Sequence, residues 1–143
     1  MKHHPNSKHF KDKADRLWSF LVREIGRCEI CSKEGRPDAK GWCIVGLDAH
    51  HLIPRANLRY RWDAQNGISL CKSHHGAHPH YRNHTSAVHG SGEVYERFKT
   101  DLAMRDPVKF NYWQQNKDDR RPMENYTYQE VCDILASQLK GTL

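Results

Sequence analysis

Residues 28–31 read Cys-Glu-Ile-Cys and residues 71–74 read Cys-Lys-Ser-His, and these two stretches decide the fold. Two such ligands three positions apart form a tight turn whose side chains converge, and two turns of this kind can close a tetrahedron around Zn²⁺. Thirty-nine residues separate the pairs, more than in a plain zinc ribbon, so further structure must be inserted between them. The sequence therefore predicts a structural zinc site formed by Cys28, Cys31, Cys71 and His74. The alternative is that Cys71 is a buried apolar thiol and His74 a surface residue.

The composition of the chain favours the metal. Its 143 residues suit one domain, but a hydrophobic fraction of 37% and a mean hydropathy of -0.92 predict a small core. Binding of a structural zinc can add on the order of 10 kcal/mol to such a fold. The five cysteines are an odd number, and neither a secretion signal nor a membrane-spanning stretch is visible. A cytoplasmic location with free or metal-bound thiols is therefore expected.

A second group of polar residues lies within and just beyond the insert. It consists of Asp48, His50, His51, Asn66 and His75, with His78 close behind. Neighbouring residues on an extended strand point to opposite sides, so His50 and His51 are expected to do different work. One can bind a metal ion while the other faces a water molecule. An imidazole with a pKa near about 6.5 is mostly neutral at pH 7 and can accept a proton from that water.

This pattern resembles a known family. The string LDAHHLIPRA at residues 47–56, followed by Asn66 and by LCKSHH at residues 70–75, is similar to the HNH motif of ββα-metal endonucleases, and the resemblance covers Cys28 to about His78. It implies that His51 is the general base, that His50 and His75 bind a catalytic divalent cation, and that Asn66 fixes the loop carrying the base. It also implies hydrolysis of DNA that leaves 5′-phosphate and 3′-hydroxyl ends. His74 stands where the family usually has cysteine, so the structural site becomes Cys₃His.

Several roles in this group stay open at the level of sequence. Asp48 either orients His50 or His75 or is a solvated strand end, and Asn66 is explained equally well by an Asn-Gly turn. His78 is a possible third ligand or a phosphate contact, whereas His80, His84 and His89 are interpreted as loop residues. The catalytic cation also stays open: imidazoles favour Mn²⁺, Ni²⁺, Co²⁺ or Zn²⁺, while the family commonly works with Mg²⁺.

The charge distribution favours an anionic partner. The net charge is +6, and the excess lies in residues 1–62, which hold 13 basic and 7 acidic side chains. Arg55, Arg59 and Arg61 follow the proposed base, with Tyr60 and Trp62 between or beside them. Basic and aromatic side chains in this order suit contact with DNA phosphates and stacking on a base, although any single arginine could belong to a solvated loop.

Hydrophobic periodicity predicts an α+β fold. A disordered tail is expected over residues 1–11, a helix over 12–25, short strands within 42–54, and a turn at Asn66-Gly67 leading into a short helix from Ile68. Further helices are predicted over 93–106 and, after a capping box of Thr127 and Glu130, over 128–140. In domain terms, 12–90 form the nuclease core with its N-terminal helix, and 91–143 form a C-terminal helical extension packed on it.

The two ligand pairs, Cys28 with Cys31 and Cys71 with His74, are called the zinc knuckles below. Buried positions are expected at large aromatic residues and at the two cysteines outside these knuckles. The predicted core residues are Trp18, Phe20, Trp42, Phe98, Trp113, Cys43 and Cys132.

The sequence as a whole indicates a ββα-metal (HNH) core held by a zinc-knuckle pair, that is, a metal-dependent DNA endonuclease of phage type that needs no membrane. Two alternatives remain from the same residues. The first is a zinc-stabilised module that binds nucleic acid without cutting it. The second is a structure-selective junction resolvase.

Overall fold

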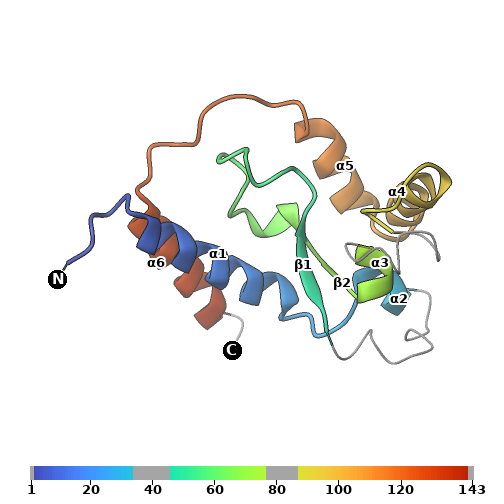
Figure 1. Ribbon diagram of the computed structural model, residues 1–143, viewed down its shortest axis with the longest axis horizontal. Helices are drawn as coiled ribbons and strands as arrows, with labels where there is room; N and C mark the ends of the chain where they lie inside the picture. The colour runs from blue at the N-terminus through green and yellow to red at the C-terminus, as the bar shows by residue number, and fades with distance from the viewer. Residues whose placement is uncertain (1, 34–45, 77–86, 142–143) are drawn as a thin grey trace.

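The computed structural model describes residues 2–33, 46–76 and 87–141, and these form a mixed α+β fold (Figure 1). The elements are α1 (Lys8–Arg23), α2 (Glu29–Lys33), β1 (Asp48–His51), the short 3-10 helix η1 (Ala64–Asn66), β2 (Gly67–Leu70), α3 (Lys72–His75), α4 (Glu93–Arg105), α5 (Pro107–Asn116) and α6 (Tyr128–Gly141). In Figure 1, α1 and α6 lie together on one side of the strand pair, while α4 and α5 lie on the other. None of the described helices is long and apolar enough to cross a membrane.

The sheet consists of β1 and β2, which pair antiparallel so that His50 lies opposite Ile68 and His51 opposite Gly67. This corrects the prediction for residues 66–70 in two ways. Asn66 ends the 3-10 helix and Gly67 is extended, with φ −104°, so the dipeptide is no hairpin turn. Ile68 belongs to a strand instead of a helix, and the helix begins only at Lys72. Four residues are too few for hydrophobic periodicity to distinguish a strand from a helix. Residues 67–70 are buried on both faces, which is typical of a strand inside a fold.

Helix α1 packs its apolar face, with Ala14, Trp18 and Val22, against the strand pair and α6. It begins at Lys8, four residues before the predicted start at Asp12, so the predicted disordered tail over 1–11 is too long. The backbone N–H of Gln129 donates to the carbonyl of Pro5 at 3.0 Å, which ties the segment before α1 to α6. The residues before α1 are therefore ordered by a contact with a segment more than 100 residues away, which their polar composition did not indicate.

Two clusters of buried side chains form the core. One joins the two knuckles to β2, α4 and α5 through Ile68, Phe98, Leu102 and Trp113, among others. The other joins α1, the segment after β1, and α6; it is formed by Ala14, Trp18, Val22, Trp62, Val131, Cys132 and Leu135. Burial of Trp18, Phe98, Trp113 and Cys132 is confirmed, but Phe20 is 56% exposed because it lies on the outer face of α1. Trp42 and Cys43 lie outside the described residues.

The C-terminal part follows its local signals closely. α4 and α6 match the predicted helices, and the capping box is confirmed: the N–H of Glu130 donates to the Thr127 hydroxyl at 3.1 Å, and the N–H of Thr127 donates to the Glu130 carboxylate at 3.2 Å. The sequence interpretation missed α5. Its start was nevertheless encoded, because Asp106 caps the helix by accepting from the N–H of Lys109 and Pro107 occupies the first turn.

Gly67 lies where α1 approaches the sheet most closely. A Cβ atom at this position would lie 2.2 Å from Cγ2 of Val22 and 2.9 Å from the ring of Trp18. We expect Gly67→Ala to lower the free energy of unfolding by about 1–3 kcal/mol, because the helix must move away from the strand. Thermal or urea unfolding measures the loss. Gly141→Ala is the matched control, since its Cβ would have no neighbour within 4 Å, and Val22→Ala should partly rescue Gly67→Ala. Equal stability of the two alanine variants would contradict this packing.

Candidate active site

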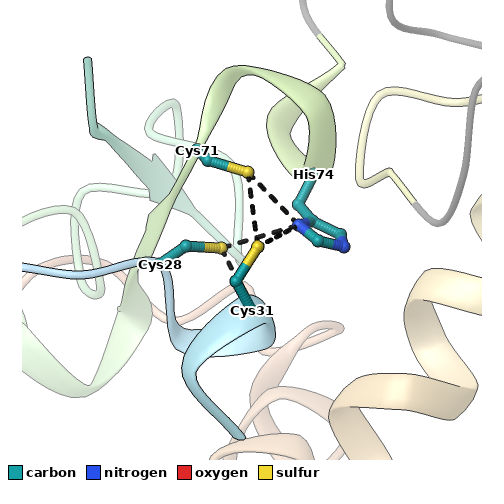
Figure 2. A group of neighbouring side chains, drawn as sticks. All are labelled: Cys28, Cys31, Cys71 and His74. Atoms are coloured by element: carbon teal, nitrogen blue, oxygen red, sulfur yellow. Dashed lines mark hydrogen bonds between the residues drawn. The ribbon is translucent and has the colours of Figure 1, made fainter. Parts of the chain in front are cut away.

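Cys28, Cys31, Cys71 and His74 converge in a buried cluster between α2 and α3 (Figure 2). The Nδ1 atom of His74 lies 3.6 Å from Sγ of Cys28 and 3.2 Å from each of the other two sulfurs, and the Sγ atoms of Cys31 and Cys71 are 3.7 Å apart. Ligands of a tetrahedral zinc ion with bonds of about 2.0–2.3 Å are separated by about 3.6–3.8 Å. The cluster therefore has the donor set and nearly the spacing that a structural zinc ion requires.

The side chains of this cluster shift one another's pKa values in opposite directions. Hydrogen bonds from the neighbouring cysteines hold the pKa of Cys28 well below its usual range. Burial lowers the pKa of His74, but its contacts with the sulfurs of Cys28 and Cys71 outweigh burial and raise this pKa to about 10. The hydrogen bond with Cys28 in turn raises the pKa of the Cys31 thiol. The cluster thus stabilises one thiolate, at Cys28, beside a protonated His74; thiolate is the form of cysteine that binds zinc, and His74 binds it on losing its proton.

Glu29 connects this cluster to the rest of the fold. Its carboxylate accepts a hydrogen bond from the N–H of Ser69 at 2.8 Å and one from the Lys109 ammonium at 2.9 Å. The same ammonium donates to the carbonyl of Gly67 at 2.8 Å. The residue directly after Cys28 is therefore attached to both β2 and α5.

His50 faces a second group of imidazoles. Its ring centroid lies 5.3 Å from that of His75 and 4.7 Å from that of His89, and one ring nitrogen of each lies within 4.8 Å of the others. Burial, together with the neighbouring rings, lowers the pKa of His50 to about 3, so its ring is neutral at pH 7. Neutral imidazole is the form that binds a metal ion, and three imidazoles with one nitrogen each this close together could hold a divalent cation.

The structure brings His89 into this group, whereas the sequence interpretation left it as a loop residue. The segment from 87 to 90 lies against the end of α3, because the N–H of Val88 donates to the carbonyl of His74 and the N–H of His89 to that of His75. Gly76 permits this approach: it has φ +65°, and a Cβ there would lie 2.7 Å from Cβ of Ala87. No spacing rule predicts a ligand fourteen residues after His75. His78, the third ligand considered from sequence, lies outside the described residues.

Asp48 orients His75. Its carboxylate accepts from Nδ1 of His75 at 2.8 Å and from the Lys72 ammonium at 2.6 Å. Burial raises the pKa of Asp48, but these two hydrogen bonds outweigh it and hold the pKa below its usual range. Because Nδ1 of His75 is engaged as the donor, its Nε2 lone pair is left for a metal ion.

We expect Asp48→Asn to weaken binding of a divalent cation at the three histidines by about 10- to 100-fold, since the ring of His75 loses its anionic partner. Calorimetric titration with Mn²⁺ or Co²⁺ on zinc-loaded protein measures the change. Asp133→Asn is the matched control, because it removes the same charge from an exposed position on α6. Unchanged affinity in Asp48→Asn would show that the carboxylate does not orient a ligand.

His51 points to the other side of β1, as the alternation of strand residues requires. Its Nε2 atom lies 2.9 Å from the carbonyl oxygen of Arg61, and its ring stacks on that of Trp18 with centroids 3.8 Å apart and an angle of 6°. A carbonyl can only accept, so Nε2 carries the proton and Nδ1 holds the lone pair. Burial lowers the pKa of His51 despite the opposing effect of this hydrogen bond. The ring is therefore neutral and able to accept a proton at Nδ1.

Asn66 is fully buried and holds the chain that follows β1. Its Oδ1 accepts from the N–H of Ile53 at 2.7 Å, and its Nδ2 donates to the carbonyls of Ile53 and Tyr60 at 2.9 and 3.1 Å. The backbone carbonyl of Asn66 also accepts from the N–H of Leu52. One amide side chain thus satisfies backbone groups on both sides of the loop next to His51.

The three arginines proposed to contact DNA differ in their surroundings. Arg55 is exposed. Arg59 lies within 3.6 Å of Asp119 and 3.5 Å of Glu124, and the side chain of Arg61 is only 11% exposed. Arg61 makes a two-point ion pair with Asp15 of α1, with distances of 2.9 and 2.7 Å. The structure therefore gives Arg59 and Arg61 intramolecular partners that the sequence did not reveal, and their contact with DNA stays a prediction.

Comparison with known proteins agrees with this geometry. Residues 28–83, less than half of the chain, match the family described as HNH endonuclease. Neither the curated proteins nor the solved structures contain a match to this chain. The matched segment includes both zinc knuckles, β1, β2 and α3, and it excludes α1, His89 and the C-terminal helices. Residues 28–83 thus carry an HNH endonuclease domain, the domain of a family of phosphodiester hydrolases.

Proposed function

We propose that the chain is a metal-dependent DNA endonuclease that uses one divalent cation and His51 as general base. The observation that carries the proposal is that the two neighbouring histidines of β1 face different ways: His50 faces His75 and His89, while His51 faces away from them. Its Nε2 is bonded to Arg61, and among residues 2–33, 46–76 and 87–141 its Nδ1 has no hydrogen-bond partner. The Cys₃His cluster would hold a structural zinc ion between α2 and α3. β1, β2 and α3 would then form the ββα-metal core.

In this proposal each residue has one role. Nδ1 of His51 accepts a proton from a water molecule, whose oxygen attacks the phosphorus in line with the bond to the 3′ oxygen. That bond breaks, the departing 3′ oxygen takes up a proton from solvent water, and the products are a 5′-phosphate and a 3′-hydroxyl. Asn66 holds the loop that follows the base, and Asp48 fixes the ring of His75. A divalent cation bound by His50, His75 and His89 would supply neutralisation of the charge that grows on the phosphoryl and leaving oxygens.

The donor set bears on the choice of cation. Three imidazoles favour Mn²⁺, Co²⁺, Ni²⁺ or Zn²⁺ over Mg²⁺, which prefers oxygen ligands. We therefore expect stronger cleavage with one of the first four ions than with Mg²⁺.

A plasmid-nicking assay with a metal series tests the proposal. Cleavage by protein with the Cys₃His site loaded with zinc should need a further added cation and should be strongest with the preferred ion, and His75→Ala and His89→Ala should each lose activity while keeping the zinc of the Cys₃His site. His9→Ala, an exposed position on α1, is the matched control. DNA binding without any cutting by the wild-type protein would favour the zinc-stabilised binding module instead. Cutting restricted to four-way junctions would favour the resolvase.

A further inference from the structure

Helix α1 lies outside the segment that matches the HNH endonuclease family, yet it contacts the proposed base directly. Trp18 is 2% exposed, and its indole lies parallel to the His51 ring at 3.8 Å. The indole is itself fixed, because its Nε1 donates to the carbonyl of Asp63 at 2.9 Å. One whole face of the His51 ring is thus covered by a rigid aromatic surface.

The same helix also holds the hydrogen-bond acceptor of His51. The carboxylate of Asp15 accepts from Nε and Nη2 of Arg61 and, at 2.9 Å, from Nε1 of Trp62. Arg61 is the residue whose carbonyl oxygen accepts from Nε2 of His51. A carboxylate on α1 therefore anchors two consecutive residues of the segment that fixes the His51 tautomer.

The backbone opposite His51 is adapted to this arrangement. Gly67 pairs with His51 in the sheet, and the atoms that leave no room for a Cβ there belong to Trp18 and Val22 of α1. Ring geometry also separates Trp18 from ordinary core packing. The aromatic pairs Tyr60–Tyr112, Trp62–Tyr128 and Phe110–Trp113 meet at 61–88°, whereas Trp18 and His51 are nearly parallel.

We propose that Trp18 and Asp15 are positioning residues for His51, so that α1 is a working part of the nuclease and not only its cover; this inference rests on the proposed function. A hydrogen bond at Nε2 alone still allows the imidazole ring of His51 to rotate about that contact, and stacking on Trp18 prevents this rotation. Together they aim Nδ1 in one direction. A displacement of about 1 Å at a reacting group can cost about 100-fold in rate, which makes such support worthwhile.

Steady-state kinetics of DNA cleavage provide the first test. Trp18→Leu should lower kcat by about 10- to 100-fold with KM for DNA nearly unchanged, because the base is misaligned and the DNA surface is intact. Trp18→Phe should recover most of the rate, since it keeps an aromatic face. Trp113→Leu is the matched control: it removes a buried tryptophan from the other core cluster, away from His51. Rates are compared per folded molecule, at a temperature where all variants are folded.

Asp15 is tested in the same way and keeps the apolar core intact. Asp15→Ala should lower kcat, whereas Asp12→Ala, which removes the same charge from the same helix and breaks an exposed ion pair with Lys8, should not. If Trp18→Leu and Trp113→Leu have equal kcat values, or if Asp15→Ala matches Asp12→Ala, the positioning role is overturned.

Nitrogen-15 NMR of the His51 ring gives a readout that does not need activity. The wild-type ring should show a single tautomer protonated at Nε2, and Trp18→Leu and Asp15→Ala should show a mixture of tautomers. A single unchanged tautomer in both variants would overturn the inference. If the wild-type protein cuts no DNA but its tautomer still depends on Trp18 and Asp15, the proposed function fails while the positioning of the ring stands.

Discussion

Replacement of His51 by alanine should reduce DNA cleavage by about 10²- to 10⁴-fold, the usual contribution of a positioned general base. The fold and the bound zinc should be kept, because His51 belongs to neither the Cys₃His cluster nor the His50 group. Plasmid nicking at saturating cation measures the loss, and circular dichroism with metal analysis checks the fold. His9→Ala is again the control for removing an imidazole. Retained cutting in His51→Ala would remove the base assignment and leave catalysis to another group.

The pH dependence of DNA cleavage should also identify His51 as the base. Burial lowers the pKa of His51 from the ordinary histidine value of 6.5, so the neutral, proton-accepting ring persists to lower pH than in a free histidine. Activity should therefore be lost on acidification only below about pH 6.5, as the ring protonates. An acid limb that falls well above this pH would point to a different base.

Removal of the structural zinc should unfold the chain, which is the second large effect. Zinc bound by a cluster of this type contributes on the order of 10 kcal/mol, comparable to the whole stability of a small domain. We expect Cys28→Ser and Cys31→Ser to lose zinc and to melt far below the wild-type temperature. Strong chelation should do the same to the wild-type protein. Thermal melts followed by circular dichroism, together with metal content, measure both effects.

The control for these variants is Cys132→Ser, which alters a buried thiol that belongs to the other core cluster and donates to the carbonyl of Phe10. Its cost should be much smaller, and its zinc content should be unchanged. His75→Ala should also keep zinc and fold, because its ring belongs to the group around His50. If His75→Ala lost zinc as Cys28→Ser does, the separation into two metal sites would be wrong.

Much of the metal chemistry could be predicted from the sequence. The four members of the Cys₃His cluster lie where their spacing placed them, and His74 and His75 separate into the two groups as predicted. The opposite orientation of His50 and His51 followed from strand alternation, and the Thr127 capping box announced α6. Apart from the meeting of the two ligand pairs, which are 39 residues apart in the sequence, each of these features depends on a few neighbouring residues and on the geometry of one turn or strand.

Other features could not be predicted, for reasons that are also physical. Ile68–Leu70 is too short for its periodicity to distinguish strand from helix. His89 enters the histidine group through backbone pairing with α3, and Arg61 is held by Asp15 across 46 residues of sequence. Neither contact can be predicted from the spacing of residues in the sequence.

The sequence by itself therefore determined which four side chains could form the Cys₃His cluster and that His50 and His51 point to opposite sides of a strand, because ligand spacing and strand alternation are short-range properties. The tertiary structure alone decided what surrounds His51. The stacking of Trp18, the anchoring of Arg61 by Asp15 and the close approach of α1 at Gly67 join segments that are far apart in the chain. Such contacts arise only when the helix packs on the sheet, since packing depends on the combined shape of both surfaces.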